Sequence, residues 1–417
     1  MNDDLRVPIE SVFRQESGKI IASLIRVSGS FDLAEEAMQD AFAAAIRRWP
    51  ETGIPANPAA WITSAAQRKL VDYARRERTR RNKEAALAYE TETSISPEDP
   101  FSGAEAMSFP DDRLRLIFTC CHPALDADSQ VVLTLRTLGG LTTPEIARAF
   151  LIPEPTLAQR LVRAKNKIKH ARIPYEIPPP RALPGRLASV QKTLYLIFNE
   201  GYAATAGDNL VRRELCAEAI RLARTLCELM RSEPENIGLL ALMLLHDSRR
   251  EARVNTHGGL VTLEDQDRSL WKREQIVEGL LLVERALQMR RSGPYQLQAA
   301  IAALHSQAEE AEATDWREIA ALYERLLLLQ PSPVVALNHA VAVAFGENLA
   351  KGLALIDQLG SSGELGSYYL YYAARADILR RLGRTAEAAD AYTRALSLTA
   401  NAVERRYLRR RLAMLTC

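Results

Sequence analysis

Apolar side chains recur at helical spacing along almost the whole of this chain, and that feature most constrains its fold. Among its 417 residues we find no convincing alternation of apolar and polar residues, the pattern of a half-buried strand. Two segments break the helical pattern. Residues 84–112 hold eight acidic residues, three prolines and no Lys or Arg, and residues 173–185 hold five prolines. We therefore expect an all-α protein whose helical domains are separated by an acidic linker and a stiff proline-rich spacer.

These breaks predict five consecutive segments. They are a first helical domain (1–83), the acidic linker (84–112), a second helical domain (113–172), the proline-rich linker (173–185) and a C-terminal helical domain (186–417). A hydrophobic content of 47% is ample for packed cores in all three domains.

Cysteine usage and hydropathy indicate the compartment. Five cysteines, an odd number, together with the lack of a signal-like N-terminal stretch, favour a reducing environment, so we expect a cytoplasmic protein. The longest apolar run, residues 239–245, is far shorter than the roughly 20 residues that a membrane span needs. We expect no membrane association.

Residues 141–169 predict a pair of short helices. Thr142 followed by Glu145 forms a capping box, so Pro144 falls in a first turn where its missing N–H costs nothing. The first helix would bury Ile146, Ala147 and Phe150. Pro155 marks the start of the second helix, which would bury Leu157, Leu161 and Ala164.

The outer face of that second helix is polar near its start and basic further on. A recognition helix in the major groove has this layout, with polar side chains for base edges and cations for phosphates. A helical hairpin with a solvated charged face would look similar. The predicted DNA-binding residues are Thr156, Ala158, Gln159, Arg160, Arg163, Lys165 and Lys167.

A second basic segment, residues 61–83, holds eight Lys and Arg against Asp72 and Glu77. Ala65, Leu70 and Tyr73 would line an inner face with Trp61 at its start. Clustered cations and an aromatic residue suit a DNA backbone with unstacked bases. The predicted contacts are Trp61, Arg68, Lys69, Arg75, Arg76 and Arg78.

Just upstream, residues 31–49 predict an amphipathic helix with Asp32 as its N-cap. Its polar face is acidic and would favour a basic region of a protein over nucleic acid. The residues expected to be exposed on this face and to bind a protein are Glu35, Glu36, Gln39 and Asp40.

At this point the chain resembles a known family, the bacterial sigma factors of the extracytoplasmic-function type. Residues 32–49 (DLAEEAMQDAFAAAIRRW) resemble the region 2 helix that grips core RNA polymerase, and residues 60–76 (AWITSAAQRKLVDYARR) resemble the segment that melts and reads the minus 10 element. Residues 141–165 (LTTPEIARAFLIPEPTLAQRLVRAK) resemble the region 4 helix-turn-helix, which reads the minus 35 element. The acidic linker matches the family's negatively charged connector. The resemblance covers residues 1 to about 172.

The resemblance implies a sigma factor with core RNA polymerase and promoter DNA as partners. It implies no catalytic side chain and no cofactor, because the polymerase performs the chemistry. Many relatives have asparagine seven residues after the tryptophan, near the flipped minus 10 base, where this chain has Arg68. Base preference at that position is therefore not carried over.

The C-terminal segment suggests a built-in regulator. From about residue 316, Ala320, Ala354 and Ala388 recur at the 34-residue period of tetratricopeptide repeats, with Tyr323 and Tyr392 filling gaps between helices. The segment resembles the sigma factor subgroup with a fused tetratricopeptide-like domain. Such a domain would bind an unknown protein or peptide. A generic alanine-rich bundle is the alternative.

Two further groups of residues invite a metal or enzyme interpretation. Cys120, Cys121 and His122 are adjacent but lack the usual chelating spacing, so we expect buried thiols. The polar stretch 246–268 would form an ion-pair network or a docking surface; a metal-dependent enzyme site there is the remote alternative. Its residues assigned to regulatory docking are His246, Asp247, Arg249, Arg250, Arg253, Asp267 and Arg268.

A third alternative is a helix-turn-helix regulator with a tetratricopeptide sensor that is not a polymerase subunit. This alternative would assign no function to the acidic face of residues 35–40 or to the basic helix of residues 61–81. No metal site and no enzyme activity are expected overall.

Overall fold

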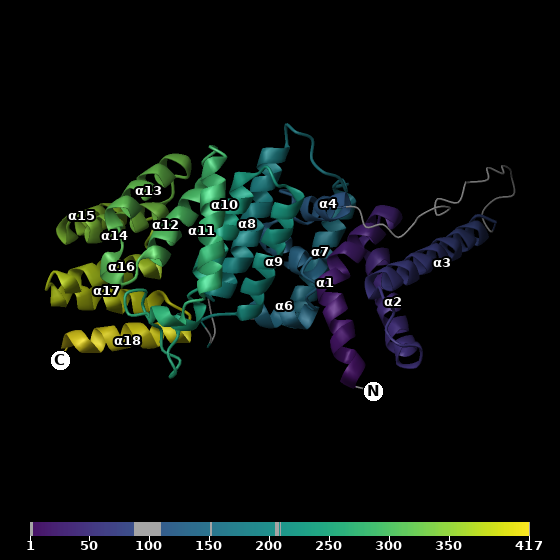
Figure 1. The fold of residues 1–417 in the computed structure, drawn as a ribbon, viewed down its shortest axis with the longest axis horizontal. Coiled ribbons are helices and arrows are strands. Elements are labelled where there is room, and N and C mark those ends of the chain that lie inside the picture. The colour runs from purple at the N-terminus through teal and green to yellow at the C-terminus, as the bar shows by residue number, and fades with distance from the viewer. Residues whose placement is uncertain (1–2, 87–109, 151, 205–207, 209, 417) are drawn as a thin grey trace. The chain divides into compact units, whose positions relative to one another are not determined.

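The computed structural model describes residues 3–86, 110–150, 152–204, 208 and 210–416 (Figure 1). Within these ranges the chain forms helices and no strand; two residues, Val254 and Leu260, make an isolated bridge. The all-α prediction is confirmed. The chain forms two compact units, residues 1–193 (unit 1) and 194–417 (unit 2), which are described separately. No helix of the described ranges is long and apolar enough to span a membrane.

Unit 1 begins with three helices that pack together, α1 (Asp3–Ser28), α2 (Phe31–Thr52) and α3 (Pro58–Ala86). Trp49 of α2 is only 1% exposed and meets the ring of Trp61 edge to face, with ring centroids 5.6 Å apart. The predicted N-cap of α2 was wrong. Ser30 caps the helix by accepting a hydrogen bond from the backbone N–H of Leu33, and Asp32 lies in the first turn.

The second part of unit 1 holds α4 (Pro110–Cys120), α5 (Ala127–Thr137), α6 (Thr143–Phe150) and α7 (Glu154–His170). The predicted capping box at α6 is confirmed: the Thr142 N–H donates to Glu145 Oε2 (2.7 Å), and the Glu145 N–H donates to Thr142 Oγ1 (3.4 Å). Pro155 lies in the first turn of α7, as expected. α6 and α7 therefore form the predicted helical pair. The predicted buried residues confirmed as buried are Ile146, Ala147, Leu157, Leu161 and Ala164; Phe150 is half-buried.

The predicted linker boundaries need correction. α4 begins at Pro110, inside the segment assigned to the acidic linker. Asp112, in the same segment, is fully buried and forms an ion pair with Arg26. Residues 87–109 of that segment lie outside the described residues. The proline-rich segment is not a free spacer, because Ile173 is buried and Tyr175 donates hydrogen bonds to the carbonyls of Ala22 and Asp112. The boundary between the units falls instead between residues 193 and 194, within α8 (Leu183–Tyr202).

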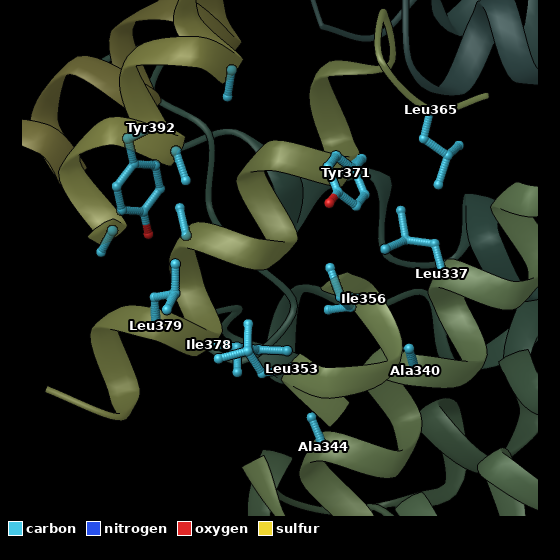
Figure 2. Packing of buried hydrophobic residues seen from close by; sticks show 14 of the residues in the cluster. Leu337, Ala340, Ala344, Leu353, Ile356, Leu365, Tyr371, Ile378, Leu379 and Tyr392 are labelled. Carbon is cyan, nitrogen blue, oxygen red and sulfur yellow. The ribbon is translucent and has the colours of Figure 1, made fainter. Parts of the chain in front are cut away.

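The rest of unit 2 consists of α-helices, with three short 3-10 helices between them in the described residues. Figure 2 shows part of its core: Leu337, Ile356 and Tyr371 lie near one another, and Tyr392 belongs to the same cluster on its other side. The helices are α9 (Arg213–Leu229), α10 (Pro234–Asp247), η1 (Arg250–Arg253), η2 (Arg268–Leu270), α11 (Arg273–Gln288), α12 (Pro294–Gln307), η3 (Ala311–Ala313), α13 (Trp316–Leu329), α14 (Pro333–Gly346), α15 (Leu349–Gly360), α16 (Tyr369–Arg381), α17 (Thr385–Leu398) and α18 (Ala402–Thr416).

The alanine period is only partly reflected in the packing. Ala320 of α13 and Ala388 of α17 are buried, but Ala354 of α15 is exposed. Gly352 occupies the helix crossing instead: a Cβ there would lie 2.3 Å from the Cβ of Ala344 on α14. The close approach of α14 and α15 therefore occurs two residues before Ala354. The tetratricopeptide assignment itself stays a prediction.

The adjacent cysteines are core thiols, as expected. Cys120 and Cys121 are 0% and 1% exposed, and their sulfurs contact the hydroxyls of Thr137 (3.2 Å) and Thr134 (3.5 Å) on α5. Burial raises the pKa of both thiols. They hold α4 against α5 as small, protonated side chains.

Candidate nucleic-acid interface

α7 presents an open polar surface at its N-terminal end. Leu157, Leu161 and Ala164 face inward, so the residues between them point away from the core. This leaves an exposed strip that begins polar and ends basic, the layout that major-groove reading requires. The exposed members of the predicted set are Thr156, Ala158, Gln159, Arg163 and Lys167.

Two of the predicted DNA contacts are instead engaged within unit 1. Arg160 Nη1 donates to Asp128 Oδ2 on α5 at 3.0 Å. Lys165 Nζ donates to Glu35 Oε2 (2.7 Å) and to Asp32 Oδ1 (3.1 Å), both on α2, and its side chain is 15% exposed. Arg160 pairs with an exposed carboxylate and can exchange it for a phosphate at little cost. Lys165 is much less accessible in this arrangement.

The basic segment lies on α3, which starts with a cap from Asn57: its Oδ1 accepts from the N–H of Ala60 at 3.0 Å. Trp61 is half-buried, and its ring packs against that of Trp49. Arg68 and Arg75 are exposed. The side chains of Arg76 and Arg78 lie outside the described residues, although both positions are on the helix.

The acidic face of α2 is only half open. Glu36 and Gln39 are exposed, as expected. Glu35 was expected to be exposed, but its side chain is 14% exposed because Lys165 covers it.

Asp40 Oδ2 accepts a hydrogen bond from Tyr73 Oη (3.0 Å) and lies 3.5 Å from Lys69 Nζ, both on α3. Burial and this bond raise the pKa of Tyr73 to about 12. Asp40 therefore joins α2 to α3, and Lys69 is shared between its predicted DNA role and this pair.

Further contacts join the first three helices to the α4–α7 part of unit 1. Asp112 accepts from Arg26 Nε on α1 (2.9 Å) and from Arg115 Nη1 on α4 (3.2 Å). Tyr175 bonds to the carbonyl of Ala22 on α1. Together with the Lys165–Glu35 pair, these contacts define what we call the closed arrangement of unit 1.

The polar stretch 246–268 lies in unit 2 and is largely an internal network. Asp247 is 2% exposed; its Oδ1 lies 3.1 Å from Arg250 Nη1, and its Oδ2 accepts from Gln275. Its assignment to a docking surface was therefore wrong, because the carboxylate is enclosed by its partners. Asp267 is the N-cap of η2. The described residues contain no group of three metal-ligating side chains.

Arg249 and His246 form a different kind of contact. Arg249 Nη2 lies 2.8 Å from Nδ1 of His246, and burial lowers the pKa of that imidazole well below its usual value. The imidazole is therefore neutral and accepts the bond. Arg253 stacks on the Tyr202 ring, and Arg268 on the Trp271 ring.

Sequence reasoning missed the residues that make the tertiary pairs. Tyr73 was assigned to the inner face, yet its hydroxyl binds Asp40. Asp112 was assigned to the linker, yet it is a buried ion-pair partner. In both cases the partner lies more than 30 positions away in the sequence, so no local pattern signals it.

Comparison with known proteins gives three consecutive matches to family models. Residues 12–80 match sigma-70 region 2, residues 115–168 match sigma-70 region 4, and residues 186–287 match a family of unknown function, DUF6596. The two sigma matches contain the predicted polymerase-facing and DNA-facing helices. They confirm the recognition of region 2 and region 4.

Relatives extend the comparison. The probable ECF RNA polymerase sigma factor SigI of Mycobacterium tuberculosis (strain ATCC 25618 / H37Rv) is 25% identical over 174 residues, which is 41% of this chain and 58% of that protein. No solved structure matches the chain. An uncharacterized protein of Rhizobium meliloti (strain 1021) is 45% identical over 395 residues, 94% of this chain and 92% of its own length. The chain therefore belongs to the same family as this Rhizobium meliloti protein, and it carries the region 2 and region 4 domains of the sigma-70 family.

Proposed function

We propose that this chain is an alternative sigma factor of the extracytoplasmic-function type, acting in the cytoplasm. It binds core RNA polymerase, recognises the minus 35 and minus 10 elements, and promotes initiation of transcription. The observation that carries the proposal is the open N-terminal face of α7, which lies inside the segment matched to sigma-70 region 4. No side chain of this chain is required to perform chemistry.

The minus 35 element would bind along α7. Gln159 in the first half of α7 and Arg163 at its middle are exposed and have N–H donors for acceptors on base edges, whereas Lys167 lies one turn further on and suits a phosphate. Arg160 would join them after leaving Asp128. Each good base contact is expected to supply about 1–3 kcal/mol of discrimination.

The minus 10 element would bind along α3. The exposed part of the half-buried Trp61 ring would offer a surface on which an unpaired base can stack, and Arg68 and Arg75 would offer cations for the strand. Glu36 and Gln39 on α2 would contact the polymerase from the opposite side of region 2.

The closed arrangement sets a condition on this function. Two elements about 25 base pairs apart lie roughly 85 Å apart along B-form DNA. A compact unit of 193 residues has a radius of gyration of only about 16 Å. Unit 1 cannot reach both elements while closed, so binding to core polymerase would separate region 2 from region 4. Separation of region 2 from region 4 would also break the Lys165–Glu35 ion pair and expose both side chains.

The test is transcription in vitro with core polymerase lacking sigma, using promoter DNA selected by the full-length protein. The expected result is a promoter-specific transcript that depends on this chain. DNA binding without co-purification of core polymerase and without transcripts would favour the regulator that is not a polymerase subunit.

The C-terminal unit is proposed as the built-in regulator, with an unknown protein or peptide as its partner. A truncation that tests this should end at Tyr202, because Thr193 and Ser189 on α8 both donate to Gln130 of unit 1. We expect transcript yield from this truncated chain to differ strongly from that of the full chain. Equal yields at matched concentration would remove the regulatory role.

A further inference from the structure

Helix α11 carries apolar side chains on its outer side as well as on its inner side. The inner stripe, with Ile276 and Ala286, is buried, and the helix packs against α10 and α12. On the outer side, Val277, Leu281 and Leu287 are 48%, 61% and 55% exposed. The apolar side chains of an amphipathic helix normally face the core. The outer side of α11 therefore carries apolar surface that the fold of unit 2 leaves uncovered.

This apolar side borders a groove of about 480 Å³ that is lined by residues of α11, α12 and α13. Because α12 packs against both of the other helices, it forms the floor of the groove and they form its walls. Leu281 and Leu287 line one wall, and Leu322 lines the other. Leu329, which is 51% exposed, continues the Leu322 stripe of α13 two turns further on. Single exposed leucines are ordinary, but leucines gathered around one hollow indicate a binding surface.

The groove has the surroundings that a helix requires. Two helical walls above a helical floor resemble the environment of a core helix in a bundle, so the side chains of a further helix can pack between those of α11 and α13. The floor helix α12 has 14 residues. Its length of about 21 Å gives room for about four turns of a bound helix. The anchors of such a helix recur at positions i, i+3 or i+4, and i+7.

Three exposed charged side chains of the lining determine which helix is complementary to the groove. They are Glu284 on α11 and Glu318 and Arg325 on α13. Within the described part of the chain, none of the three forms an ion pair. Arg325 lies seven residues after Glu318, about 10 Å further along the helix axis. Two carboxylates against one guanidinium leave the groove with an excess of negative charge. A complementary partner therefore has basic residues beside its apolar anchors.

We propose that the groove between α11 and α13 binds an amphipathic helix of another protein, with leucine-like anchors on one face and basic residues beside them. Leu281, Leu287 and Leu322 contact the anchors, and Glu284 and Glu318 pair with the basic residues. The proposal rests on the proposed role of unit 2 in binding a protein or peptide, and it gives that partner a site and a chemistry. It uses no contact with polymerase or promoter DNA, so a binding test can fail while the sigma factor proposal stands.

The test is a selection of peptides on the immobilised full-length protein. The probe is a phage-displayed library of randomised peptides of about 18 residues, long enough for the groove, without Cys, Gly or Pro. We expect the enriched peptides to carry leucine-like residues at i, i+4 and i+7 with Lys or Arg beside them, and to become helical on binding, as followed by circular dichroism. No enrichment over a blank surface, or enriched sequences without this spacing, would overturn the proposal.

Variants locate the bound peptide, with affinity measured by fluorescence anisotropy of the most enriched sequence. Leu281→Asp should weaken binding by about tenfold or more. Leu270→Asp is the matched control, because this leucine of η2 is 52% exposed outside the groove, and it should leave binding unchanged. Glu284→Lys should weaken binding severalfold, and replacing the facing Lys of the peptide by Glu should restore it. Equal affinity of Leu281→Asp and the unchanged protein would show that the peptide binds elsewhere and would overturn the site.

Sedimentation velocity of the free protein tests the competing occupant, a second copy of this chain. We expect the unchanged protein and Leu281→Asp to sediment alike, because the groove is open in the absence of its partner. A dimer that Leu281→Asp dissociates would show that a second copy covers the groove, and the assignment to another protein would be wrong. Circular dichroism of each variant checks that its helices are retained.

Discussion

Replacing Asp112 by Ala should loosen unit 1 where α1 meets α4. The carboxylate is fully buried and accepts hydrogen bonds from Arg26 (2.9 Å) and Arg115 (3.2 Å). A hydrogen bond to a charged group contributes about 1.5–3 kcal/mol, and water recovers part of the loss because both arginine side chains are 34% exposed. We expect the local free energy of opening to fall by about 3 kcal/mol, close to the lower end for a broken buried ion pair.

Amide hydrogen exchange followed by mass spectrometry measures this locally. A loss of about 3 kcal/mol corresponds to exchange on the order of a hundredfold faster in peptides from α1 and α4. Peptides from α16 and α17 in unit 2 serve as internal reference. The control is Asp128→Ala, which removes an exposed carboxylate paired with Arg160 and should cost about 1 kcal/mol or less. A change below threefold in α1 and α4 would refute the reasoning.

Three further predictions concern binding and pH. Gln159→Ala should cost about 1–3 kcal/mol at the cognate minus 35 element and relax discrimination in a binding assay, whereas Lys167→Ala should weaken cognate and scrambled DNA alike; equal losses for both would contradict base reading. Glu36→Lys should abolish co-purification with core polymerase while Glu51→Lys, an exposed change at the far end of α2, should not. Because the folded pKa of His305 is depressed to about 4, its contribution to stability is present above pH 6.5 and is lost as pH falls toward 4; thermal unfolding should show about 2 kcal/mol lost between pH 7 and pH 5, and His305→Gln should flatten that dependence.

Local signals in the sequence predicted the helices of region 4 well. The Thr142–Glu145 capping box and Pro155 depend on neighbours within one turn, so spacing alone locates them. The exposed residues of α7 could also be predicted, because the apolar residues that face the core leave the remaining positions of the helix facing outward. The prediction for α2 was weaker, because Ser30 and Asp32 are both good caps and only the backbone geometry decides between them.

What the sequence could not predict is which charged side chains are occupied by partners distant in the chain. Glu35 and Lys165 belong to two predicted binding faces, yet they pair with each other. A charge on a helix face looks solvated until the opposing surface is known. Arg249, Arg253 and Arg268 show the reverse case: an ion-pair network was one expectation for their segment, yet among the described residues these three contact an imidazole or backbone carbonyls and no carboxylate at ion-pair distance.

The two buried cysteines of unit 1 can report chemically on opening of the α4–α5 packing. Cys120 ends α4 and Cys121 follows it, both packed against α5, and thiols whose pKa is raised by burial react slowly with alkylating reagents. Alkylation therefore requires α4 and α5 to separate, so the rate of labelling reports how often this part of unit 1 opens. Mass spectrometry can follow that rate at native residues, with the polymerase present or absent, and no dye or engineered site has to be added to the protein.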